Sequence, residues 1–189
     1  MATAEIHAAT LTPGKLELLA EWLPTQEWFT GDDGGALTRV AAARFVDPAG
    51  EVGIETMLVG AGDHVFHVPL TYRGAPLVGA EAFLVGEMEH SVLGPRWVYD
   101  ASGDPVYLAE VRRVIVEGDR EADLSQGVKT LTVLGSGGAE GAPSLEGATL
   151  DIIRSIDDAP SGADPLGSLT GRWAHGGAPR SAVLVVLRH

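Results

Sequence analysis

The first periodic pattern of apolar residues in the chain predicts a helix at about residues 13–23. Leucine recurs there at intervals of three and four, as on the buried face of a helix, at Leu16, Leu19 and Leu23. Thr12 followed by Pro13 is typical of a helix start, because threonine can cap the first turn and proline loses no hydrogen bond at the first position. Pro24 is expected to end this helix.

After the helix the period of the apolar pattern changes to two, which is typical of strands. Strands are predicted at residues 40–46 and 51–59, on either side of residues 47–50, whose Asp-Pro-Ala-Gly sequence fits a type I turn. Residues 64–72 form a third strand. Because Pro69 has no N–H for a β-ladder, that strand is expected at a sheet edge or with a bulge. The pattern therefore predicts a three-stranded antiparallel meander.

Two further strands and a second helix follow the meander. The strands are predicted at residues 81–89 and 96–99. The helix is predicted at residues 105–117, where Asp104 serves as the N-cap, proline occupies the first position and Gly118 ends the helix. The apolar stripe along this helix predicts one buried face.

The last part of the chain has short strands between glycine-rich loops, which are predicted at residues 135–147 and 157–167. The final two strands form a hairpin around Gly176 and Gly177. An unbroken apolar run in the last strand indicates a central position in a sheet. The strands predicted in this part are residues 130–134, 149–156, 168–174 and 181–187.

The order of these elements predicts an α+β fold. A curved, mainly antiparallel β-sheet is expected to pack against the two principal helices, and the chain is expected to end in a C-terminal β-hairpin. Residues 1–118 are predicted to form one α+β region, and residues 119–189 a β-rich extension packed on it. With 189 residues, the chain suits one compact domain that contains both parts.

Composition and charge exclude several functional classes. The chain has 26 acidic and 13 basic residues, and a net charge of −13 that is spread along its length. Nucleic-acid binding is not expected, because phosphate contacts need clustered lysine and arginine. The absence of cysteine excludes disulfides and thiolate metal sites. No apolar run reaches the ~20 residues of a membrane span, and the N-terminus lacks a signal pattern, so we expect an uncleaved, cytoplasmic protein that binds no membrane.

Two sequence motifs in the first half of the chain together indicate a family resemblance. The first lies at residues 18–29, where a helix ends in Leu-Pro and Thr-Gln-Glu leads to Trp-Phe. The second joins Val-Pro-Leu at residues 68–70 to Trp-Val-Tyr-Asp-Ala at residues 97–101 and Asp-Pro at residues 104–105. Over about residues 5–117, the chain thus resembles the N-terminal cap of actinobacterial maltokinases and related aminosugar kinases.

In those kinases the cap precedes an intermediate lobe and a catalytic lobe. The resemblance extends to stand-alone actinobacterial proteins of about this length that are described as maltokinase-cap-like. It implies that residues 1–118 form the cap-like region, and that the protein takes part in maltose, trehalose or α-glucan metabolism.

The catalytic parts of such kinases have no counterpart in the sequence. There is no catalytic loop with His-Gly-Asp, and residues 149–154 offer no lysine to grip a nucleotide. We therefore expect a non-catalytic accessory or regulatory binding protein, without catalytic residues, cofactor or metal site. The alternative is a kinase-related or glucan-acting enzyme, engaged in ATP-dependent sugar phosphorylation or associated with α-glucan branching. Expected partners are a sugar kinase or another protein of the α-glucan pathway, or a small sugar.

The first motif supplies three aromatic residues, Trp22, Trp28 and Phe29. If these rings are exposed, they form a surface on which a partner kinase could dock. The alternative is that the two later rings fold back on the helix and pack in the core, the more common use of large aromatic side chains.

The strands predicted at residues 81–89 and 96–99, with the loop between them, supply a polar set of candidate residues: Glu87, Glu89, His90 and Arg96. The two glutamates are predicted to point the same way from their strand. Next to Arg96, the histidine could shuttle a proton or bind a sugar hydroxyl. The alternative is that the glutamates face water while the histidine satisfies backbone groups of a loop.

Trp97, Tyr99 and Asp100 could form a carbohydrate platform of aromatic faces and a carboxylate. The alternative is core packing of the two rings, with Asp100 as a turn residue. His64 and His67 lie at an odd offset on one strand, which sends their side chains to opposite faces, so no shared metal is expected there.

Overall fold

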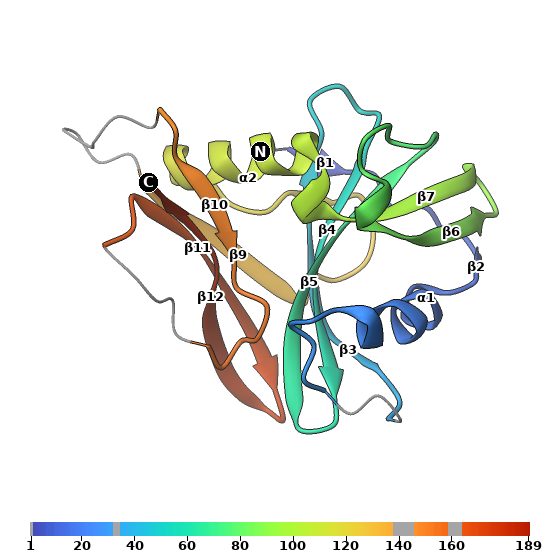
Figure 1. Cartoon of the computed structure of the whole chain (residues 1–189), viewed down its shortest axis with the longest axis horizontal. Helices are drawn as coiled ribbons and strands as arrows, with labels where there is room; N and C mark the ends of the chain where they lie inside the picture. Colours follow the sequence, from blue (N-terminus) through green and yellow to red (C-terminus); the bar gives the residue numbers. More distant parts are fainter. Residues whose placement is uncertain (1, 32–34, 138–145, 159–163) are drawn as a thin grey trace.

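Two antiparallel sheets face each other in the computed structural model, and one helix lies across the end at which they diverge (Figure 1). The structure describes residues 2–31, 35–137, 146–158 and 164–189. The larger sheet is strongly curved, and a second helix packs against it, which confirms the predicted α+β fold. A short parallel pair, β1 (Thr3–Ala4) with β8 (Asp123–Leu124), lies outside both sheets.

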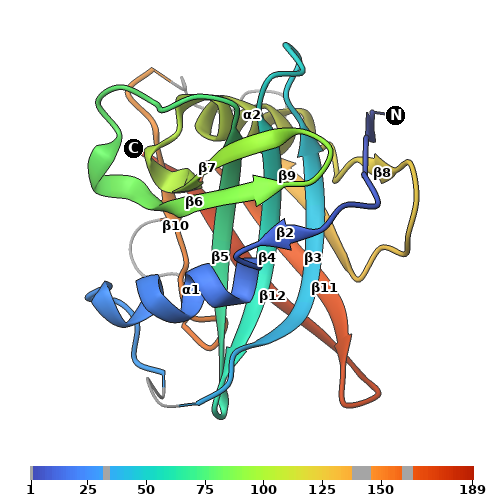
Figure 2. The same cartoon turned by 90° about the vertical axis from the view of Figure 1, so that its right-hand side faces the viewer.

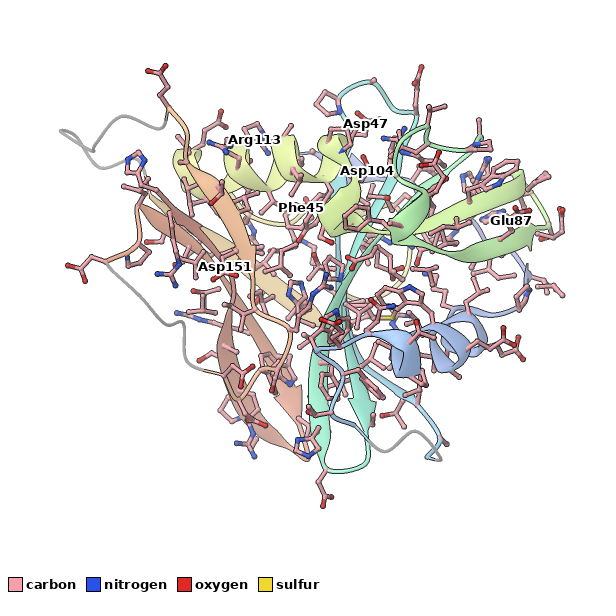
Figure 3. All side chains as sticks on the ribbon, viewed as in Figure 1. Phe45, Asp47, Glu87, Asp104, Arg113 and Asp151 are labelled. Carbon is pink, nitrogen blue, oxygen red and sulfur yellow. The ribbon has the colours of Figure 1, made fainter. Side chains whose placement is uncertain are left out.

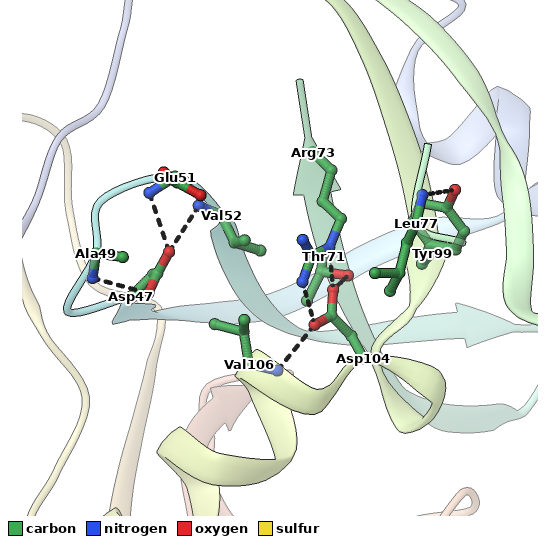
Figure 4. A network of polar contacts seen from close by, with 10 residues as sticks. All are labelled: Asp47, Ala49, Glu51, Val52, Thr71, Arg73, Leu77, Tyr99, Asp104 and Val106. Atoms are coloured by element: carbon green, nitrogen blue, oxygen red, sulfur yellow. Dashed lines mark hydrogen bonds and ion pairs between the residues drawn. The ribbon is translucent and has the colours of Figure 1, made fainter. Parts of the chain in front are cut away.

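The larger sheet has six strands in the order β2-β6-β7-β5-β4-β3. Its three longest strands form the predicted meander, and the Asp-Pro-Ala-Gly turn closes with a bond of 2.9 Å from the Gly50 N–H to the Asp47 carbonyl. The Asp47 carboxylate accepts three further backbone N–H bonds from the turn (Figure 4). The strands are β2 (Leu11–Thr12), β3 (Thr38–Val46), β4 (Gly53–Ala61), β5 (His64–Arg73), β6 (Leu84–His90) and β7 (Gly94–Asp100).

The prediction that Pro69 marks an edge strand or a bulge was wrong. β5 pairs with β4 in unbroken register through Pro69, and β7 pairs with its other side. The proline is tolerated because the pairing with β7 begins only at Leu70, so the missing N–H falls just before that ladder.

The smaller sheet has four strands in the order β10-β12-β11-β9: β9 (Leu131–Gly137), β10 (Thr149–Ile152), β11 (Gly167–His175) and β12 (Ala178–Arg188). The predicted terminal hairpin is β11–β12, and β12 is internal, as its apolar run indicated. The strand predicted at 149–156 ends early, because the backbone after Ile153 leaves this sheet and binds β5. Parts of the two predicted loops, residues 138–145 and 159–163, lie outside the described residues.

The first helix, α1 (Lys15–Trp22), begins later than the sequence pattern predicted. Thr12 does not cap it, because this residue belongs to β2 and pairs with Glu89 of β6. Gly14 is the N-cap, and its N–H donates to the Glu17 carboxylate at 2.6 Å. A single 3-10 turn (Leu23–Thr25) continues the helix through Pro24.

The second helix, α2 (Pro105–Glu117), has both predicted caps. Asp104 accepts a bond of 2.9 Å from the Val106 N–H, and Gly118 ends the helix in the left-handed conformation with φ of 64°. The short 3-10 turns Glu81–Phe83 and Ala101–Gly103 come before β6 and before α2.

Apolar side chains form two cores. One fills the space between the two sheets and α2, and includes Phe45, Tyr107, Leu131 and Leu184. The other lies between α1 and the larger sheet, and includes Leu19, Met57, Phe66 and Val98. Because α2 packs on β9 and β11, the first core joins both halves of the chain; the division at residue 118 stays a prediction. Among the described residues, no helix is both long and apolar enough to cross a bilayer.

Candidate functional site

Polar side chains gather at the seam where the smaller sheet meets β5. On the side away from β4, the end of β5 binds β7 from Leu70 onward, while its earlier part binds residues 153–156. The Arg154 carbonyl accepts the His67 N–H at 2.7 Å, and the Ile156 N–H donates to the Val65 carbonyl at 3.2 Å. We call the polar residues at this junction the seam cluster: Thr56, His67, Asp100, Tyr107 and Arg154.

Arg154 is the centre of the seam cluster. Its Nη2 lies 2.6 Å from Asp100 Oδ2 and 3.2 Å from the Ser102 hydroxyl. The flat guanidinium also lies over the Trp28 ring, 4.6 Å from its centre, which is favourable for a cation and an aromatic face. Arg154 thus joins the second half of the chain to both resemblance motifs, since Trp28 belongs to the first and Asp100 to the second.

His67 is fully buried in this cluster, and its proton can be assigned from its partner. Nδ1 lies 3.1 Å from the Ile153 carbonyl, which can only accept, so Nδ1 carries the hydrogen of the neutral ring. Nε2 is then an acceptor. Burial, and then the neighbouring charge of Arg154, lower the pKa of His67 to about 3.

Four buried polar atoms of the seam cluster form no standard hydrogen bond with any of the described residues. Tyr107 is fully buried, and burial raises the pKa of its hydroxyl well above the usual range. The site thus presents a guanidinium donor, an imidazole acceptor and two hydroxyls in a water-poor interior. The four atoms are Thr56 Oγ1, His67 Nε2, Tyr107 Oη and Arg154 Nη1.

A second buried polar group, Glu55, lies on the opposite face of β4, beneath α1. Its carboxylate binds Lys15 Nζ and the Tyr72 hydroxyl, both at 2.6 Å, and Arg44 lies 3.4 Å away. Burial opposes ionisation of Glu55, but the charges of Arg44 and Lys15 outweigh it and lower its pKa to about 2. Since each of these groups has a partner, the cluster anchors the start of α1 to the sheet.

Asp104, the first residue of the Asp-Pro motif, binds side chains of β5 and also caps α2 (Figure 4). Its fully buried carboxylate receives two bonds of 2.7 Å from the Arg73 guanidinium and one of 2.7 Å from the Thr71 hydroxyl, besides capping α2. Burial opposes ionisation, but the bonds from Arg73 and Thr71 prevail and lower the pKa of Asp104. The motif therefore fastens α2 to β5.

Trp22, Trp28 and Phe29 pack against the core, in agreement with the interpretation that the two later rings fold back on the helix. Trp22 is only 8% exposed, and the other two rings are half-buried against the core beneath α1. The Trp22 and Trp28 ring centres lie 5.9 Å apart, and Phe29 lies 4.9 Å from Phe66. The chain turns back after Pro24, so the rings cover the buried end of β5 and Arg154.

The predicted platform of Trp97, Tyr99 and Asp100 does not form. Tyr99 is buried, and its hydroxyl accepts the Leu77 N–H at 2.8 Å (Figure 4). Asp100 is buried too, because it is the partner of Arg154 and accepts the Ser102 N–H as a turn residue. As the alternative interpretation held, Tyr99 and Asp100 serve the interior, and only Trp97 is partly exposed.

The remaining predicted residues lie on the β6–β7 hairpin. Glu87 and Glu89 are exposed on one face, on either side of buried Met88, as their spacing predicted. His90 Nδ1 accepts the N–H groups of two turn residues at 3.1 and 3.2 Å, so it serves the loop backbone. Arg96 occupies the same face as His90 and donates to the Pro95 carbonyl at 3.0 Å.

Sequence reasoning missed Thr56, Tyr107 and Arg154 as members of one site, because five separate segments supply the seam cluster. The only local signal is a polar residue in an apolar run, such as Thr56 between Ile54 and Leu58. His64 is exposed while His67 is buried, so the predicted separation of the two rings holds. Within the described ranges, no group of three or more histidine, aspartate or glutamate side chains is arranged to hold a metal.

Replacing Arg154 with lysine is expected to lower the free energy of unfolding by about 1 kcal/mol. Lysine keeps the charge beside Asp100, but it loses the flat contact of the guanidinium with the Trp28 ring. Urea unfolding followed by tryptophan fluorescence would measure the change. The exposed β11 residue Arg172 is the matched control, and an equal effect of Arg172→Lys would contradict the assigned role.

Comparison with known proteins agrees with the resemblance seen in the motifs. Residues 22–104 match the family model described as the maltokinase N-terminal cap domain. This range begins in α1, includes the whole meander and the β6–β7 hairpin, and ends at the N-cap of α2. No curated protein matches the chain. Residues 22–104 are therefore similar to the maltokinase N-terminal cap domain.

Proposed function

We propose that this chain is a non-catalytic accessory binding protein of maltose and α-glucan metabolism. The match of residues 22–104 to the maltokinase cap domain carries this proposal, because it associates the chain with that metabolism through a region other than a kinase catalytic lobe. The polar motif residues of the region support a binding role over a chemical one. Asp100 and Asp104 each form an ion pair inside the fold.

The surface that we propose for binding is the β6–β7 hairpin, which projects from the body of the protein (Figures 1 and 2). Val92 and Leu93 at its tip are 57% and 44% exposed. His90 accepts both of their N–H groups, so the tip has a defined shape. We call the exposed set the hairpin surface: Glu87, Glu89, Val92, Leu93 and the partly exposed Trp97.

The chemistry of the hairpin surface suits a protein partner. Two exposed aliphatic side chains and an aromatic ring offer apolar area, and two carboxylates lie on the same hairpin. Glu87, one of these carboxylates, is labelled in Figure 3. Apolar anchors with charged residues around them are typical of protein interfaces. We propose a sugar kinase or another protein of the α-glucan pathway, with a cationic rim around an apolar patch, as the partner.

The test is capture from a lysate of the organism that encodes the chain, with the wild type and Val92→Ser/Leu93→Ser as baits. We expect an α-glucan-pathway protein with the wild type and a loss of at least tenfold with the double variant. Leu134→Ser removes an equally exposed leucine from β9 and is the matched control. Equal capture by all baits would refute the hairpin surface.

Calorimetry with ATP, maltose and trehalose tests the non-catalytic assignment separately. The proposal expects no turnover of either sugar in the presence of ATP. Phosphorylation of a sugar by the purified chain would overturn the accessory role, whatever the capture experiment gives.

A further inference from the structure

The unpartnered atoms of the seam cluster are complementary in kind. Arg154 Nη1 can only donate, and His67 Nε2 can only accept, because Nδ1 holds the ring hydrogen. The Thr56 and Tyr107 hydroxyls can each do both. A molecule with two donors and two acceptors would complete all four groups.

The four atoms also belong to one locality. Thr56 and His67 lie on the same face of neighbouring strands, since Leu58 pairs with His67 and Thr56 precedes it by two residues. Such diagonal neighbours on a sheet are within reach of each other's side chains. The Tyr107 hydroxyl lies within hydrogen-bonding reach of the Thr56 hydroxyl, and the charges of Arg154 and Asp100 also act on it. Arg154 is joined to His67 through its own carbonyl.

Leaving these groups without partners would be costly. A buried polar group that forms no hydrogen bond loses its hydration without compensation. Thr56, His67 and Tyr107 are all fully buried, so bulk water does not reach them. Interior groups of this kind are usually completed by ordered water, which typically makes about three hydrogen bonds.

We propose that the seam cluster is a buried hydration site, in which one or two water molecules join Arg154 and His67 to the Thr56 and Tyr107 hydroxyls. The water accepts from Arg154 Nη1 and donates to His67 Nε2, and the hydroxyls take the remaining bonds. It connects β4, β5 and α2 with the segment that leaves β10. The cap-like region is thereby held to the C-terminal sheet.

Removal of the two hydroxyl groups tests this site, because the sign of the change in melting temperature depends on whether the hydroxyls form hydrogen bonds. Thr56→Val and Tyr107→Phe keep the shape of each side chain. If water is bound, each variant is expected to lower the melting temperature by about 2–4 °C, the shift typical of one lost hydrogen bond in a domain of this size. The double variant should lose less than the sum, because the two hydroxyls are neighbours in one hydrogen-bond network.

Thr170→Val on the partly exposed face of β11 is the matched control and should leave the melting temperature nearly unchanged. Near-ultraviolet circular dichroism of every variant checks that the fold is kept. Unchanged or raised melting temperatures for both seam variants would overturn the proposal, since unbonded hydroxyls are better replaced by apolar groups.

A high-resolution crystal structure of the wild type gives the second test. We expect density for water at ~2.7–3.2 Å from at least three of the four atoms. Density for a larger molecule at this place, or side chains that close on one another without water, would refute the hydration site.

Discussion

Asp104→Ala is expected to lower the free energy of unfolding by about 3–5 kcal/mol, the usual cost of breaking a buried ion pair. The substitution removes the acceptor of two Arg73 bonds, of the Thr71 hydroxyl and of the Val106 N–H. Arg73 would remain half-buried without its carboxylate, and α2 would lose its N-cap, which alone contributes about 1 kcal/mol. Guanidinium unfolding, followed by circular dichroism, would measure the loss.

Two control variants separate the contribution of the Asp104–Arg73 ion pair from that of the helix N-cap. Asp104→Asn keeps an oxygen for the Val106 N–H but loses the ion pair, so it should fall between the wild type and the alanine variant. Asp151→Ala removes an exposed aspartate of β10, whose nearest Arg188 nitrogen lies 3.6 Å away, and should cost less than about 1 kcal/mol. If Asp104→Ala cost no more than Asp151→Ala, the anchoring role of the motif would be wrong.

The sequence predicted features whose cause is local. The turn at residues 47–50 and both caps of α2 were correct, because the residues that form them are neighbours in the chain. The predicted start of α1 was wrong because Thr12 pairs with Glu89, which is distant in sequence. The local signals for a helix start do not show that Thr12 pairs with another strand instead.

The candidate site was less predictable than the fold. The pattern of Trp28 and Phe29 is the same for an exposed surface and for a buried one, and their contact with Phe66 decides between the two. Arg154 lies inside the strand predicted at residues 149–156, yet its side chain reaches Asp100 and Trp28 in the other half of the chain. Such a site depends on how the two sheets meet, which no single segment encodes.

The stability of the protein is expected to fall between pH 6.5 and pH 5 because of His67. Its pKa is about 3 in the folded protein, against an ordinary value of 6.5. Below pH 6.5 the unfolded chain therefore binds a proton that the folded protein refuses, so acid favours unfolding. The contribution is complete above pH 6.5 and is lost as the pH falls towards 3, by up to about 1.4 kcal/mol per pH unit.

The groups that surround His67 fix this sign. Burial disfavours the charged ring, the Arg154 guanidinium repels it, and the Asp100 carboxylate nearby is already paired with that guanidinium. Glu55 acts in the same direction but at lower pH, since its pKa falls from 4.5 to about 2 on folding. The change in the free energy of unfolding between pH 6.5 and pH 5 thus reports on histidine and contains little contribution from Glu55.

His67→Asn isolates the effect, because the asparagine amide can donate to the Ile153 carbonyl in place of Nδ1 but does not titrate. Urea unfolding of the wild type at pH 7.5, 6.5, 5.5 and 5.0 should show a loss of roughly 2 kcal/mol across the series. The variant should start lower but lose much less, with only a small remainder from His90, whose pKa is also lowered by burial and by His7. His64→Asn changes an exposed histidine of the same strand and should keep the wild-type slope. Parallel curves for the wild type and His67→Asn would show that His67 is protonated in the folded protein, and that the neutral imidazole assigned to the seam cluster is wrong.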